Sequence, residues 1–330
     1  MPRLDKLHQF MEAAGEPHSR NGKDDKPTES VIDLAPYLRE PQYSLSEVIL
    51  PETTQRQVSL ILAELKHYEL IYHKWGMAEK HKHDKALCIN FWGPPGTGKT
   101  MTAEVLAHEL GLKILVVPYA QIESKYVGET PKNIEAVFEF AKAHNAVIFF
   151  DEADSFLGKR LENVTQSADT SVNLTRSVML MKLSSYDGIV VFATNLIRNY
   201  DPAFISRIRW QVQFDLPDEA ARSKIWQAQI PTQLPVEEAV DFDQLASQFS
   251  EVSGRDIKKA VLQAVVAAAS EEKPDADKCV TQPHFTQSIE EVLAGKKAAE
   301  KTEVKLTPVS GDVQLPPQPP TAGSEPSAAA

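Results

Sequence analysis

The chain has 330 residues, 42% of them hydrophobic, and a formal net charge of −11 at pH 7. That is enough for one large globular domain with a smaller companion. The acidic balance argues against tight, sequence-independent binding to nucleic acid, which depends on Lys and Arg neutralising phosphates. The two cysteines, Cys88 and Cys279, provide neither a disulfide framework nor a thiolate zinc site. No apolar run reaches the roughly 20 residues of a membrane span, so we expect a cytoplasmic protein.

The first 44 residues mix charges, prolines and glycines without sustained periodicity, which predicts a mobile N-terminal arm. Apolar residues at helical spacing then predict a core-facing helix over 53–75. Residues 86–92 form an apolar run typical of a buried strand. A helix over 101–110 follows, and Gly111 ends it.

Strands and helices alternate in the middle of the chain. The pattern predicts strands over 113–118, 146–150, 189–194 and 211–216, and helices over 131–144 and 173–182. Thr130 is the expected N-cap of the first of these helices, with Pro131 at its first position. Such alternation predicts an α/β fold, a parallel sheet with helices on both faces.

After residue 217 the strands stop. Helical patterns over 219–229, 242–249, 255–270 and 282–293 predict a small α-helical domain, and the proline-rich segment from 296 predicts a disordered tail. We therefore divide the chain into a mobile arm (1–44), a large α/β nucleotide-binding domain (45–217), a small helical lid (218–295) and a disordered tail (296–330).

The segment GPPGTGKT at 93–100 follows the first predicted strand and opens the next helix. Glycines let the backbone curl so that its N–H groups face a phosphate without an obstructing Cβ. Lys99 adds a point charge for the terminal phosphates, Thr100 offers a hydroxyl to Mg²⁺, and the helix adds its positive dipole end. The residues predicted to bind the nucleotide are Gly93, Pro94, Pro95, Gly96, Thr97, Gly98, Lys99, Thr100, Met101 and Asp151.

Two acids end the apolar run over 146–150. An unpaired carboxylate in a dry site is costly, so these side chains are expected to face something charged. Downstream of a phosphate-binding loop, Asp151 is predicted to hold Mg²⁺ and Glu152 to activate the attacking water. Residues 151–154 (DEAD) also spell a helicase signature, but such helicases need a second α/β domain, and only helical or disordered sequence follows the last predicted strand here.

With these residues identified, the chain resembles the AAA family of ATPases from about residue 45 to residue 293. Residues 93–100 are similar to the family's Walker A motif and residues 149–154 to its Walker B motif. Residues 193–195 resemble sensor 1, which implies that Asn195 helps Glu152 to hold the water. Residues 253–256 resemble sensor 2, which implies that Arg255 of the lid lies near the phosphates. The resemblance implies ATP hydrolysis with Mg²⁺.

Residues 201–209 resemble the family's second region of homology, which implies that Arg207 reaches the site of a neighbouring subunit as an arginine finger. Such a finger stabilises charge on the transferred phosphoryl group. The family often has two arginines three apart, whereas Arg207 and Arg209 are two apart, so Arg209 stays an alternative. A finger in trans implies a homo-oligomeric ring, most often a hexamer.

Residues 125–129 (KYVGE) resemble a central pore loop, in which Tyr126 and Val127 would grip a polypeptide. A second pore loop at 158–160 competes with a solvated connection. The leading hypothesis is therefore a motor that remodels or partially unfolds a protein partner in the pore of its ring. A compact single-ring motor of this kind resembles the pachytene-checkpoint type, which implies a HORMA-domain partner and, for bacterial members, a role in antiviral defence.

Three alternatives remain. A nucleic-acid-linked ATPase is disfavoured by the acidic balance of the chain. An unfoldase that works with a separate protease would carry a docking motif, such as a hydrophobic-Tyr-x ending, which residues 328–330 do not form. A binding-only pseudoenzyme would have lost Lys99 or Glu152.

Overall fold

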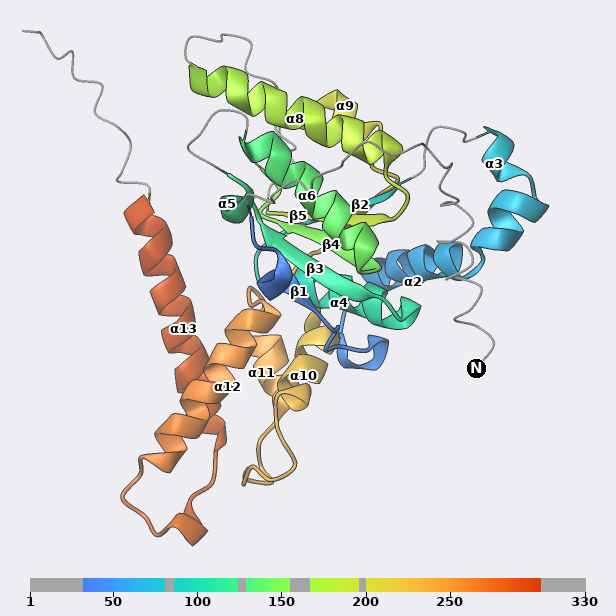
Figure 1. Cartoon of the computed structure of the whole chain (residues 1–330). Coiled ribbons are helices and arrows are strands. Elements are labelled where there is room, and N and C mark those ends of the chain that lie inside the picture. The colour runs from blue at the N-terminus through green and yellow to red at the C-terminus, as the bar shows by residue number, and fades with distance from the viewer. Residues whose placement is uncertain (1–31, 81–85, 124–128, 155–166, 196–199, 304–330) are drawn as a thin grey trace, which may run out of the picture.

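A computed structural model of the chain describes residues 32–80, 86–123, 129–154, 167–195 and 200–303. In this part of the chain, six strands form one sheet in the order β1-β3-β4-β5-β2-β6 (Figure 1). Neighbouring strands pair in parallel except for β1, which is antiparallel to β3. The strands are β1 (Leu38–Arg39), β2 (Leu87–Trp92), β3 (Lys113–Pro118), β4 (Ala146–Asp151), β5 (Ile189–Thr194) and β6 (Trp210–Gln213).

Helices cover both faces of the sheet, α6 and α8 on one and α2 and α4 on the other (Figure 1). Successive side chains of a strand point to opposite faces, so Phe149 packs in the core on the side of α2 and α4, and Phe150 in the core on the side of α6 and α8. The predicted α/β fold is confirmed. The four helices are α2 (Glu52–Lys66), α4 (Lys99–Leu110), α6 (Glu129–Ala143) and α8 (Ser167–Ser185).

The C-terminal helices pack around a third core of their own. Trp226 of α10 and Phe285 of α13 are fully buried there, and their rings meet edge to face at a centroid distance of 5.8 Å. The proposed boundary between residues 217 and 218 falls between β6 and α10. The helices are α10 (Glu219–Ala228), α11 (Phe242–Gln248), α12 (Gly254–Ala269) and α13 (Gln282–Glu303).

Several predicted ends shift. The strand predicted to reach residue 216 ends at Gln213, and the helix expected from Pro131 begins at Glu129, so Thr130 lies inside α6 and is not its N-cap. The disordered tail predicted from residue 296 is wrong for residues 296–303, which belong to α13, and its remaining residues lie outside the described part of the chain. The remaining elements are η1 (Ala35–Tyr37), η2 (Leu45–Glu47), η3 (Glu69–Lys74), α3 (Met77–Lys80), α5 (Tyr119–Ile122), α9 (Pro202–Ile205) and η4 (Asp275–Asp277).

The single helix predicted over 53–75 is wrong. α2 ends at Lys66, and after His67 and Tyr68 the chain continues as the π-helix η3. The wider turn of a π-helix changes the phase of the helix but leaves apolar residues at nearly helical spacing. Periodicity therefore could not reveal the change.

The mobile arm predicted over 1–44 does not hold for residues 32–44. Leu34 is 3% exposed and packs in the core beside α6, and β1 pairs with β3. A buried carboxylate secures this segment, because Glu104 of α4 accepts hydrogen bonds from the Arg39 side chain at 2.5 Å and from the Gln42 backbone N–H at 3.0 Å. These contacts are 62 and 65 residues apart in the chain, so local composition did not predict them.

We expect Arg39→Met to lower the free energy of unfolding by about 2 kcal/mol, because it leaves the 3% exposed carboxylate of Glu104 without its cation. Urea unfolding measures this. The control is Lys66→Met, which removes the exposed ion pair to Glu109 and should cost less than about 1 kcal/mol. Equal losses in the two variants would show that β1 is not secured through Glu104.

Candidate functional site

The loop over residues 93–98 connects β2 to α4, and three of its glycines have positive φ: Gly93 at 140°, Gly96 at 80° and Gly98 at 98°. L-residues with a Cβ rarely adopt these conformations. A Cβ on Gly93 would lie 2.0 Å from the backbone oxygen of Phe214, just beyond β6. Position 93 therefore requires glycine partly because a Cβ would clash with the backbone of Phe214, and not only because a phosphate must approach.

The first turn of α4 presents backbone donors toward this loop. The earliest N–H groups of a helix have no carbonyl partner within the helix, and here they belong to Lys99, Thr100 and Met101. The hydroxyl of Thr97 donates to the carbonyl of Pro94 at 2.9 Å and braces the curl. Loop and helix end together form a cradle suited to an anion.

Lys99 lies at the centre of the site and is only 8% exposed. Its ammonium group donates to the carbonyls of Gly93 at 2.7 Å and Pro94 at 2.9 Å, and to Oδ1 of Asn195 at 3.0 Å. The structure thus brings together two predicted residues 96 positions apart. Burial lowers the pKa of Lys99 to about 8, although the nearby carboxylate of Asp151 acts in the opposite direction.

Asp151 is the last residue of β4, and Glu152 follows it with a φ of 55°. Glutamate rarely adopts this left-handed conformation, which costs on the order of 1 kcal/mol and is found mainly at functional sites. The Glu152 N–H donates to Oδ1 of Asp151 at 3.0 Å, and its side chain is exposed. The predicted base is thus an exposed side chain directly after the end of β4. Nothing in the sequence marks this left-handed residue, because it is not a glycine.

A polar network that the sequence did not predict joins the residues after β4 to the end of β5. The Thr194 hydroxyl donates to Oδ1 of Asp154, and the backbone N–H of Ala153 donates to the carbonyl of Ala193 at 2.9 Å. Tyr200 also hydrogen-bonds to Thr194. These bonds fix the chain after β4 against the end of β5, directly beside Asn195. A threonine at the end of an otherwise apolar strand was the only local sign.

The lid contacts the loop at the start of α12. The backbone N–H of Arg255 donates to the carbonyl of Gly96 at 3.3 Å, and a Cβ on Gly96 would lie 2.7 Å from the Ser253 hydroxyl. Ser253 and Asp256 form a capping box that orders this helix end. The side chain of Arg255 is exposed, and its charge contributes to the lowered pKa of Lys99. Predicted sensor 2 and loop therefore meet.

Arg207 is not brought to the loop. In the part of the chain that the structure describes, its guanidinium donates to the Ser184 hydroxyl at 3.0 Å and to the Ala203 carbonyl at 2.9 Å. Arg209 instead forms an ion pair with Glu64 of α2 at 2.5 Å. Tyr126, Val127 and the second pore loop predicted over 158–160 lie outside the described residues.

Thr100 and Asp151 together supply a hydroxyl and a carboxylate, the hard oxygen ligands that Mg²⁺ prefers, and they lie in the first turn of α4 and at the end of β4. The donor chemistry fits the predicted metal ion. The described residues contain no cluster of three or more His, Cys, Asp or Glu side chains arranged for a metal.

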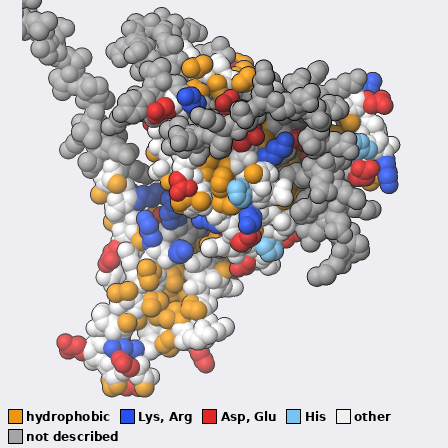
Figure 2. Space-filling model, viewed as in Figure 1, with side chains coloured by type: hydrophobic (Ala, Val, Ile, Leu, Met, Phe, Trp, Pro, Cys, Tyr) orange, Lys and Arg blue, Asp and Glu red, His pale blue; other side chains and the backbone are white. Residues whose placement is uncertain are grey.

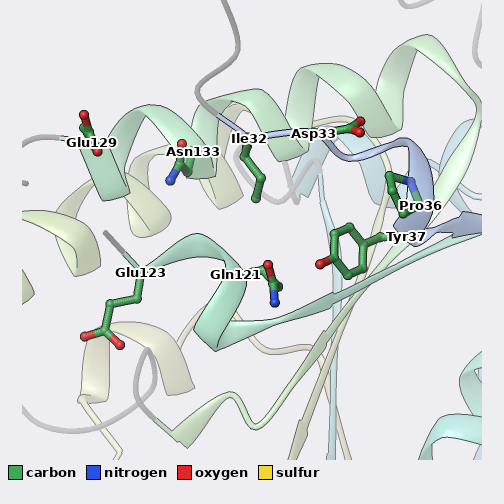
Figure 3. Close-up of a pocket in the computed structure, with 8 residues that line it drawn as sticks. All are labelled: Ile32, Asp33, Pro36, Tyr37, Gln121, Glu123, Glu129 and Asn133. Atoms are coloured by element: carbon green, nitrogen blue, oxygen red, sulfur yellow. The ribbon is translucent and has the colours of Figure 1, made fainter. Parts of the chain in front are cut away.

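A cavity of about 520 Å³ opens elsewhere, between residues 32–37, α5 and α6 (Figure 3). None of the residues predicted to bind the nucleotide lines it. Its walls carry carboxylate, amide and aromatic side chains. They are Ile32, Asp33, Pro36, Tyr37, Gln121, Glu123, Glu129 and Asn133.

Comparisons with known proteins agree with this geometry. Residues 89–216 match the family described as "ATPase family associated with various cellular activities (AAA)". The chain is 28% identical over 285 residues to the "Proteasome-activating nucleotidase" of Methanothermobacter thermautotrophicus, covering 83% of this chain and 68% of that protein. It is 32% identical over 216 residues to the "26S proteasome regulatory subunit 4 homolog" of Encephalitozoon cuniculi, covering 63% of this chain and 50% of that protein.

We expect stability without nucleotide to depend on pH through Lys99. Between pH 8 and the ordinary lysine value of 10.5, the unfolded chain binds a proton that the folded chain has released, so stability rises with pH over this window, by about 2 kcal/mol. Urea unfolding at pH 7.5, 8.5 and 9.5 measures the rise. Lys99→Met should remove it, and the exposed control Lys224→Met should retain it. The same rise in the Lys99 variant would contradict the assignment.

Proposed function

We propose that this chain, whose residues 89–216 match the AAA family of ATPases, couples ATP hydrolysis in a ring of identical subunits to the unfolding or remodelling of a protein partner. The observation that carries the proposal is the meeting of Lys99, Asn195, Asp151 and Arg255 around one glycine-rich loop. An AAA ATPase binds and hydrolyses ATP. The ring and the protein partner are the proposed part.

In the proposed mechanism, the loop and the first turn of α4 bind the phosphates, and Lys99 transfers its hydrogen bonds from loop carbonyls to phosphate oxygens. Thr100 and Asp151 would hold Mg²⁺, which when bound would neutralise charge on the phosphates. Glu152 accepts the proton of the attacking water, and Asn195 orients that water. Phosphate charge would also stabilise the protonated form of Lys99, whose pKa is lowered to about 8, mainly by burial.

Two features support a ring. Arg207 points to Ser184 and Ala203 and not to the loop of its own chain, as a residue that acts on a neighbour would. The lid also carries apolar surface, seen as a hydrophobic patch in the lower part of the molecule in Figure 2, and Leu262 and Val266 of α12 are 66% and 60% exposed. A homo-oligomer, with a hexamer as the expected form, would use such surface.

The comparisons favour one alternative over the partner first expected. The similar proteins are named for activating proteasomes or for belonging to the 26S proteasome, which supports an unfoldase that works with a separate protease. The HORMA-domain partner and the antiviral role receive no support from these relatives. The net charge of −11 continues to argue against nucleic acid.

The relatives limit how far this likeness extends. The chain spans about two-thirds of the archaeal proteins and about half of several eukaryotic ones. Among the described residues, no helix has the length and apolarity needed to cross a bilayer. The cytoplasmic location stays a prediction.

We expect Glu152→Gln to bind ATP with unchanged affinity and to hydrolyse it about 10²- to 10⁴-fold more slowly, because the amide cannot accept the proton of the water. ATP affinity and phosphate release are measured on the same preparation. Glu238→Gln, an exposed acid in the lid, is the matched control and should keep the full rate. Turnover at the normal rate in the Glu152 variant would contradict its role as base.

We expect Tyr126→Ala to retain ATPase activity but to lose the ability to unfold a fluorescent substrate protein. The reason is that the apolar face of the tyrosine side chain is proposed to grip the polypeptide. Loss of fluorescence in the presence of ATP measures unfolding. Tyr126→Phe, which retains the aromatic side chain, is the control. If Tyr126→Ala unfolded the substrate normally, the pore role would be refuted while the ATPase assignment stood.

A further inference from the structure

Four side chains form a hydrogen-bonded cluster that includes Arg209, two residues after Arg207. It comprises Glu64 of α2, Tyr72 of η3, Arg209 and Trp210, and we call it the Glu64 cluster. Oε1 of Glu64 accepts from Arg209 Nη1 at 2.5 Å and from the Tyr72 hydroxyl at 2.6 Å, while Oε2 accepts from Trp210 Nε1 at 2.6 Å. The side chain of Glu64 is 11% exposed and that of Arg209 is 24% exposed. A carboxylate with this many short bonds is firmly held.

The π-helix η3 supplies the aromatic side of the cluster. Arg209 lies over the ring of Tyr72, 5.5 Å from its centroid, and also donates to its hydroxyl at 2.5 Å. Tyr68 stacks on Tyr72 from the preceding turn, with centroids 4.4 Å apart. π-Helical turns are rare and occur frequently at functional sites. The departure from α-helical geometry that sequence analysis missed thus belongs to a packed polar arrangement.

Arg207 lies between two fixed points of the chain. On one side, the 8% exposed Asp201 caps α9 by accepting from the Ala203 N–H at 2.8 Å. On the other, the backbone N–H of Arg209 donates to the Cys88 carbonyl of β2 at 2.9 Å, and its side chain enters the Glu64 cluster. Any movement of residue 209 would therefore displace Arg207, which is two residues away.

We propose that the Glu64 cluster positions Arg207 for its action on the neighbouring subunit, and that Arg209 is a positioning residue and not the finger. This inference rests on the proposed function. It resolves the choice between the two arginines, because moving Arg209 to a phosphate would leave the nearly buried carboxylate of Glu64 without its cation. Arg207 donates to two neutral oxygens and can leave them at lower cost.

The first test separates the two arginines by charge-conserving substitution. The bonds that Arg209 donates to Glu64 and to Tyr72 both come from one nitrogen, Nη1, so the ammonium of a lysine would keep a cation beside the Glu64 carboxylate. We expect Arg209→Lys to retain hydrolysis within about 3-fold, whereas Arg207→Lys loses about 10³-fold, as expected for a finger. Arg56→Met, an exposed arginine of α2, is the control. Equal large losses at 207 and 209 would overturn the inference.

The second test distinguishes positioning in trans from local stability. Glu64→Gln should lower kcat about 10-fold or more while ATP affinity and oligomer mass stay unchanged, because a small displacement of a catalytic group is costly. Tyr72→Phe removes a single hydroxyl and provides a milder variant in which folding is maintained. We expect its kcat to fall in the same direction by about 3-fold.

Each variant is then co-assembled with Lys99→Met chains, which lack the phosphate-binding charge but keep their Arg207 and Glu64 cluster. Hydrolysis per Glu64→Gln chain should rise at least about 3-fold, because a neighbour now supplies a well-placed finger. Arg207→Ala serves as the parallel case. If co-assembly restores hydrolysis in Arg207→Ala but not in Glu64→Gln, this inference is overturned and the proposed function still stands.

If co-assembly restores hydrolysis in neither variant, the proposal that the site is shared between subunits is overturned, and this inference with it.

Discussion

The backbone of the loop over residues 93–98 has no room for side chains at Gly93 and Gly96, and much of the structure follows from this constraint. The carbonyl of Phe214 closes one side of the loop, and Ser253 and Arg255 of the lid close the other. The loop can curl only with three glycines at positive φ. The same loop therefore contacts both the residue that follows β6 and the start of α12.

The carboxyl ends of the parallel strands supply the chemistry. β2 ends in the loop, β4 ends in Asp151, and β5 ends beside Asn195, so the order of the strands places these groups together. Lys99 joins them through its bond to Asn195. The cost of burying this ammonium group is visible in its lowered pKa, and binding of an anion would offset that cost. The site thus gathers groups suited to a polyphosphate, although Lys99 must exchange its bonds to the loop carbonyls in order to bind one.

The sequence predicted the residues of the candidate site better than it predicted contacts between distant segments of the chain. The glycine-rich loop, the acids after 146–150 and the alternating pattern depend on nearby residues, and they predicted the fold and the candidate site. The left-handed turn at Glu152 had no glycine to mark it. The attachment of β1 through Glu104, and the contact of the π-helix η3 with Arg209, join segments far apart in the chain. Such contacts leave no periodicity in the segment that forms them.

The central claim is that the complete catalytic site is shared between copies of this chain. The most direct measurement is the rate of phosphate release per subunit across a dilution series in saturating ATP and Mg²⁺, with the oligomer mass determined at each concentration. The account predicts that the rate per subunit falls as oligomers dissociate, because monomers lack the neighbour's Arg207. A monomer that hydrolyses ATP at the full rate, or a chain that never assembles and releases no phosphate, would contradict it.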